Sequence, residues 1–71
     1  MDLRLFLFER RLKQTQIVRA AQTKGHGLYP ADVCRFVSGQ RRPDWVKTAI
    51  RGALLELGFT KIDLGKIEDL N

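Results

Sequence analysis

The stretch Leu28–Gly58, LYPADVCRFVSGQRRPDWVKTAIRGALLELG, predicts two helices joined by a basic loop. The first helix is expected at Pro30–Ser38, because proline suits the first helical position, where its missing N–H would be unpaired anyway. Gly39 follows and readily takes the left-handed conformation that commonly ends a helix. The second helix is expected to open at Pro43-Asp44 and to stop at Gly58. The pattern predicts an all-α fold organised around this helix pair.

The first of these helices has one apolar edge and one mixed face. Val33, Phe36 and Val37 fall at positions i, i+3 and i+4, so they are expected to pack against the core. The opposite face carries Ala31 and Arg35, a small residue and a long forked hydrogen-bond donor. Such a face can approach another surface closely.

The order of these features resembles the recognition helix and the following helix of the lambda-repressor-like helix-turn-helix family, which includes phage repressors, Cro proteins and small bacterial regulators. The resemblance lies in Val33–Gly39, in Arg41–Pro43 and in a following helix whose apolar residues end in Leu57-Gly58. It is close over Leu28–Gly58 and looser over Leu3–Thr23. It implies a small all-α DNA-binding domain of four to five helices.

The resemblance places the helix-turn-helix domain at residues 1–58 and leaves residues 59–71 as a C-terminal tail. The tail is acidic on balance, which disfavours contact with DNA. Its apolar residues and the capping-box-like spacing of Thr60 and Asp63 predict a short fifth helix or an extended dimerisation arm that packs on a second subunit. The alternative is that the tail only covers the core of its own chain.

The basic residues are unevenly distributed. Residues 1–51 hold eleven Lys and Arg against four Asp and Glu, a net charge of +7, whereas residues 52–71 have a net charge of −2. A basic body suggests a polyanionic partner, and nucleic acid is the usual one. The alternative is an excess of charge that serves only solubility.

The resemblance implies that Arg35 reads bases, together with Tyr29 and Ala31 at the start of the helix that would enter the major groove. Arginine can donate two parallel hydrogen bonds to guanine O6 and N7, and an alanine methyl can meet a thymine methyl. Tyr29 could instead brace the loop, and Arg35 could be a solvent-exposed partner of Asp32. Asp32 is favoured as a charge at the helix start.

Candidates for phosphate contacts lie at the start of the second helix of the chain, in the connector QTKGHG (residues 22–27), in the loop after the recognition helix and on the helix that follows: Gln14, Thr15, Gln16, Lys24, Arg41, Arg42 and Lys47. Such contacts position a protein on DNA without reading sequence. The alternative for each is a solvated polar side chain. The connector is longer than the tight turn of the family, a departure that bears on the angle between the two helices.

The family glutamine at the start of the second helix can be assigned in two registers. With Gln14, Ile17 takes the usual buried position, but Val18 stands where alanine is usual. With Gln16, Ala20 is suitable, but Arg19 stands where an apolar residue belongs. The Gln14 register is favoured. The buried edge of this helix, Gln14–Thr23, is expected to include Ile17, Val18 and Ala21.

The N-terminal stretch is dense in apolar residues. With Asp2 as N-cap it predicts a helix that continues through Lys13, although its alternation also suits a strand. As a helix it has two apolar stripes, one with Leu3, Phe6, Leu7 and one with Leu5, Phe8, Leu12. Either Leu5 and Phe8 help to bury a partner subunit, or the element is partly strand.

Cys34 and Trp45 are expected to have structural roles, whereas His26, beside Lys24 at the tip of the connector, could meet phosphate or stay solvated. Trp45 is expected to cap the core, and Cys34 to be a small, semi-buried side chain. A structural zinc site normally needs four ligands, and Cys34 and His26 are the only soft ligands, so no metal and no other cofactor is expected. No nucleophile–base pair or phosphate-binding glycine loop is recognisable, so neither an enzyme nor a small-molecule substrate is expected.

The sequence therefore predicts a sequence-specific regulator that binds double-stranded DNA as a homodimer, with half-sites about one helical turn apart. No apolar run is long enough for a membrane span, and the single cysteine fits a reducing cytoplasm. Two other classes remain. One is a protein-interaction module, such as an antitoxin or a phage anti-host factor, that uses Leu5 and Phe8 as its surface. The other is a basic domain that binds nucleic acid without sequence preference.

Overall fold

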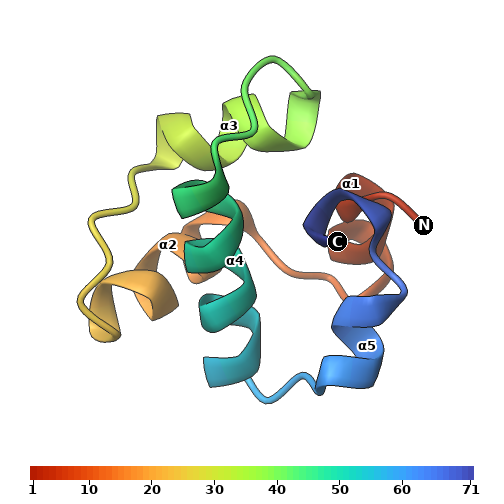
Figure 1. Cartoon of the computed structure of the whole chain (residues 1–71). Helices are drawn as coiled ribbons and strands as arrows, with labels where there is room; N and C mark the ends of the chain where they lie inside the picture. The colour runs from red at the N-terminus through yellow and green to blue at the C-terminus, as the bar shows by residue number, and fades with distance from the viewer.

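A computed structural model describes all 71 residues as five α-helices and one 3-10 helix, with no strand (Figure 1). The all-α prediction is confirmed. The helices are α1 (Leu3–Glu9), α2 (Gln14–Thr23), α3 (Pro30–Ser38), α4 (Asp44–Glu56), α5 (Lys61–Gly65) and the 3-10 helix η1 (Glu68–Leu70). None of them is long and apolar enough to cross a bilayer.

The first helix is shorter than expected. Asp2 caps α1 as predicted, because its carboxylate accepts a hydrogen bond of 2.7 Å from the backbone N–H of Leu5. The helix ends at Glu9, however, and the expected continuation through Lys13 is wrong. Arg11 adopts a left-handed backbone with φ of 56°, and the N–H of Leu12 bonds back to the Leu7 carbonyl at 2.9 Å. This turn brings Leu12 against the core.

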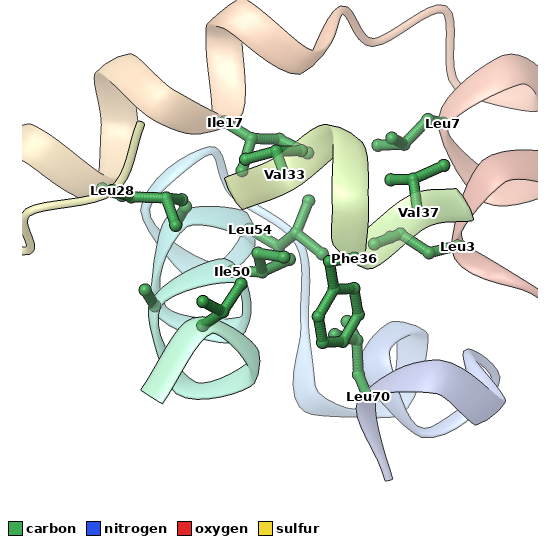
Figure 2. Packing of buried hydrophobic residues seen from close by; sticks show 14 of the residues in the cluster. Leu3, Leu7, Ile17, Leu28, Val33, Phe36, Val37, Ile50, Leu54 and Leu70 are labelled. Carbon is green, nitrogen blue, oxygen red and sulfur yellow. The ribbon is translucent and has the colours of Figure 1, made fainter. Parts of the chain in front are cut away.

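One apolar core joins all the helices, and it contains no buried polar side chain. α3 contributes Val33, Phe36 and Val37, as its spacing predicts, and Figure 2 shows these side chains among those of the neighbouring helices. α2 packs mainly on α4. Its predicted buried residues are confirmed, and Ala20 joins them: Ile17, Val18, Ala20 and Ala21.

The tail folds onto its own chain. Leu64, Ile67 and Leu70 are completely or almost completely buried in the same core as the other helices. The Asp69 carboxylate accepts a hydrogen bond of 2.9 Å from the N–H of Leu3, and the Leu70 carbonyl accepts one of 2.7 Å from Arg51. The predicted fifth helix is present, and these three apolar side chains of the tail lie inside the fold, whereas Ile62 is 75% exposed.

The start of α5 shows the reciprocal capping that the sequence suggests. The Thr60 hydroxyl accepts a hydrogen bond from the N–H of Asp63, and the Asp63 carboxylate accepts from the Thr60 N–H at 3.0 Å. Hydrogen bonds from the Thr60 backbone and hydroxyl hold the pKa of Asp63 below its ordinary value. The cap fixes where the chain turns from α4 back toward α1, which lies beside η1 in Figure 1.

Candidate nucleic-acid interface

The outward face of α3 is open to solvent. Ala31 and Arg35 are exposed, and Tyr29, just before the helix, is 66% exposed. The Asp32 carboxylate accepts a hydrogen bond of 3.1 Å from the Tyr29 N–H. Asp32 therefore stabilises the helix start, as the sequence analysis favoured.

Trp45 is not part of the core, and its expected capping role is wrong. The residue is 53% exposed, whereas its neighbour Val46 is buried. The apolar stripe of α4 runs through Val46, Ala49 and Ile50. Successive helix residues are about 100° apart, so Trp45 points to one side of that stripe. The spacing of the stripe is the signal that could have placed Trp45 on the surface.

Trp45 belongs to a surface recess that we call the α3–α4 recess. Its volume is about 150 Å³, and its lining combines two arginines, an aspartate, a tryptophan and two small apolar residues: Asp32, Arg35, Arg41, Pro43, Trp45 and Val46. The structure thus brings a predicted base-reading residue and a predicted phosphate contact to one place, beside an aromatic ring.

The two arginines of the recess are available to a ligand. Neither the Arg35 nor the Arg41 side chain makes a hydrogen bond or an ion pair within the chain, although Asp32 lies at the same recess. Guanidinium groups bind phosphate or base edges through two parallel hydrogen bonds, and they also stack on aromatic rings. The α3–α4 recess can therefore bind an anionic group through its two arginines, while a base or sugar of the same ligand packs on the Trp45 ring.

Arg42 has a different environment from Arg41. Its Nε donates a hydrogen bond of 3.0 Å to the Phe36 carbonyl, and its Nη2 lies 3.4 Å from Asp69 Oδ2. Its guanidinium carbon is 5.4 Å from the centroid of the Phe36 ring. These contacts tie the end of α3 to η1. The phosphate contact predicted for Arg42 would have to compete with these contacts. Arg41 is therefore the arginine of this loop whose guanidinium has no partner within the chain.

The other predicted phosphate contacts are not gathered at this recess. Gln16 lines a second hollow, with Glu56 at the C-terminal end of α4, and Lys24 lies 3.8 Å from the Glu56 carboxylate. Trp45 and Glu56 are separated by about 16 Å along the helix axis. Gln16 also accepts a hydrogen bond of 2.8 Å from the N–H of Lys13, which caps α2.

Three further candidates lie on other parts of the surface. Gln14 is half-buried and Thr15 is exposed in the first turn of α2, and Lys47 is half-buried in the first turn of α4. None of the three lines the α3–α4 recess or forms an ion pair. Cys34 is exposed on α3, so its expected semi-buried position is wrong. The buried side of α3 is narrow and is formed by Val33 and Phe36, and Cys34 lies outside it.

The connector between α2 and α3 packs against α4 and does not extend freely into solvent. Leu28 is fully buried, and its carbonyl accepts a hydrogen bond of 3.4 Å from Gln22. A methyl group placed at Gly52 would lie 3.6 Å from His26 Nε2, so the glycine allows this side chain close to α4. In Figure 1 the connector runs along the outer edge of the molecule, from the end of α2 up to α3. The added loop length is accommodated without separating α2 from α3, which remain in contact.

No protein-family model, curated protein or solved structure matches this chain.

Proposed function

We propose that this protein is a sequence-specific regulator of transcription that binds double-stranded DNA through α3, as the resemblance to repressor and Cro proteins implies. The observation that carries the proposal is the α3–α4 recess, where Arg35 and Arg41 have no partner in the chain and lie beside the exposed Trp45. Two unpaired guanidinium groups next to the free face of a helix suit a polyanion with readable edges.

The dimensions of α3 suit the major groove. An α-helix with its side chains is about 10–12 Å across, so the major groove, about 12 Å wide, admits it, and the nine residues of α3 extend for about 13 Å. Tyr29 and Ala31 lie at the N-terminal end of the helix, where the small Ala31 side chain permits close approach. Arg35 lies one turn further on and reaches for guanine, while Arg41 contacts phosphate and the Trp45 ring packs on the sugar-phosphate backbone. Two copies acting as a homodimer would read an inverted repeat.

The first experiment is a selection from random duplex DNA. The enriched sequence and a scrambled control are then titrated at two salt concentrations. Enrichment of one sequence that binds far more tightly than the control supports the proposal. Weak, salt-labile binding without an enriched sequence indicates a basic domain that binds nucleic acid non-specifically, and contradicts it.

Replacing Arg35 by Ala is expected to reduce discrimination at one base position of the site. The loss is about 1–3 kcal/mol, because two hydrogen bonds to one base disappear. The measurement compares the affinity ratio of the selected and single-base-substituted duplexes for the two proteins. Cys34→Ala, a change at the neighbouring exposed position, serves as the matched control. If the affinity ratio of the two duplexes were the same for Arg35→Ala and for the wild type, Arg35 would not read a base.

Arg41 and Arg42 make a matched pair of adjacent arginines. Arg41→Ala is expected to weaken binding to all DNA sequences without a change in stability. The slope of log K against log salt concentration should fall in magnitude by about one, because one counterion fewer is released. Arg42→Ala is expected to lower the free energy of unfolding by about 1–2 kcal/mol, because Asp69 loses a partner and the Phe36 carbonyl a donor. Salt titrations and urea unfolding of both variants test this division. Equal losses of DNA affinity would assign phosphate contact to both arginines.

A second candidate function is supported by the exposed apolar side chains of α1. Phe8 is 81% exposed and Leu5 is 45% exposed, and such neighbouring apolar groups often mark a protein-binding surface. A protein-interaction module that uses this surface would bind its partner with little dependence on salt. It would show no enriched sequence in the DNA selection.

A further inference from the structure

The outward stripe of α1 lies opposite its buried stripe. Leu3, Phe6 and Leu7 face the core, and Leu5 and Phe8 face solvent. Asp2, Arg4, Leu5 and Phe8 line a shallow, mainly apolar hollow on this side. A helix that is apolar on both sides buries more surface than one small core requires, so the outer stripe is available to another molecule.

Charged residues flank the outer stripe in a self-complementary order. Arg4 precedes Leu5, and Glu9 follows Phe8, so the residues occupy position g of one heptad and positions a, d and e of the next. Neither the Arg4 nor the Glu9 side chain forms an ion pair or a hydrogen bond within the chain. Each therefore has its charge free for a partner.

A parallel pair of α1 helices satisfies both charges. In a parallel helix pair, the a and d residues face each other across the axis, and each g residue lies beside the following e residue of the other chain. Arg4 of each copy then meets Glu9 of the other, while Leu5 and Phe8 cover one another. An antiparallel pair would place Arg4 near Arg4 and Glu9 near Glu9, where like charges repel.

We propose that the outer stripe of α1 is a homodimer interface, with a twofold axis parallel to the helix and with two symmetric Arg4–Glu9 ion pairs. The interface is short, so the free protein dimerises reversibly. Two half-sites on one DNA raise the effective concentration of the two copies and stabilise the dimer. This second role rests on the proposed DNA binding, whereas the dimer interface itself does not.

Sedimentation equilibrium of the full chain without DNA tests the interface. The wild type is expected to show a reversible monomer–dimer equilibrium as its concentration rises to the millimolar range. Phe8→Glu should weaken dimerisation at least tenfold. Ile62→Glu changes a similarly exposed apolar residue on α5 and should leave the equilibrium unchanged. A wild type that stays monomeric overturns the proposal, and so does an equal loss of dimerisation in both variants. A monomer that uses this surface to bind another protein overturns it as well.

Charge exchange tests the parallel order. Arg4→Glu and Glu9→Arg should each weaken the dimer about three- to tenfold, because each creates two like-charged contacts. The double variant Arg4→Glu/Glu9→Arg recreates both ion pairs in reverse and should recover the wild-type dimerisation constant. These substitutions put charge where the helix dipole favours it, so the fold is retained. The parallel pairing is contradicted if both single variants dimerise as well as the wild type. It is also contradicted if the double variant dimerises as weakly as the single variants.

Titrations of DNA separate this inference from the proposed function. Phe8→Glu should bind a single half-site as tightly as the wild type does, but it should lose cooperative binding to the inverted repeat. If the wild type dimerises as described and binds no DNA, the interface stands and the DNA proposal fails. If single half-sites bind well and the protein stays monomeric, the reverse holds.

Discussion

Deletion of Phe59–Asn71 is expected to unfold the protein. The segment contributes three side chains that are almost completely buried, Leu64, Ile67 and Leu70. Each stabilises the fold by roughly 1.5–3 kcal/mol, so the deletion costs about 5–9 kcal/mol. That is comparable to the whole free energy of unfolding of a small domain, about 5–15 kcal/mol. The deletion also removes Asp69, which accepts a hydrogen bond from the first residue of α1. Far-ultraviolet circular dichroism and a thermal scan of the residues 1–58 protein measure the result.

The control for the deletion is Ile62→Ser. Ile62 lies in the same segment, but its side chain is largely exposed, so stability should change by less than about 0.5 kcal/mol. A residues 1–58 protein that keeps its helix content and a cooperative transition would show that α5 and η1 are dispensable. In that case the assignment of the tail to the core would be wrong.

The substitution Phe36→Ala is expected to destabilise the protein by about 3–5 kcal/mol. Phe36 is fully buried under α3, and Figure 2 shows its ring pointing away from α3 in the direction of Leu70. The Arg42 guanidinium lies against the ring, so the substitution also leaves that side chain without its apolar support. The measurement is the urea midpoint at constant m-value, followed by DNA titration at a temperature where the variant is still folded.

Phe8→Ala is the matched control, because it makes the same change at an exposed position. Measured at low concentration, where the chain is a monomer, it should alter the free energy of unfolding by less than about 0.5 kcal/mol. Equal destabilisation by the two substitutions would contradict the orientation of α3. A large Phe36→Ala effect with intact DNA binding by the residual folded protein would show that Phe36 acts through stability alone.

The local helix signals are strong enough to be read from the sequence. Pro30 and Gly39 bound α3 as predicted, because a proline at the first position and a left-handed glycine at the end depend only on neighbouring backbone. The burial of Val33 and Phe36 follows from helix periodicity in the same way. The exposure of Arg35, which makes it a site candidate, follows from the same stripe.

Long-range packing decided the features that the sequence left open or predicted wrongly. Arg41 and Arg42 are adjacent and chemically identical, but the fold places only Arg42 against Asp69 and Phe36. Trp45 is exposed because Val46 and its partners fill the core. α1 ends at Glu9 because Leu12 folds back onto the core.

The sequence by itself therefore determined the helical class, the bounds of α3 and the outward position of Arg35. These depend on capping and on a period of 3.6 residues, both of which are local. Only the tertiary structure decided that the tail completes the core, that Arg41 is free while Arg42 is held, and that Trp45 joins Arg35 at one recess. The first depends on contacts between the two ends of the chain, and the other two depend on how α3, the loop after it and α4 pack around one small core.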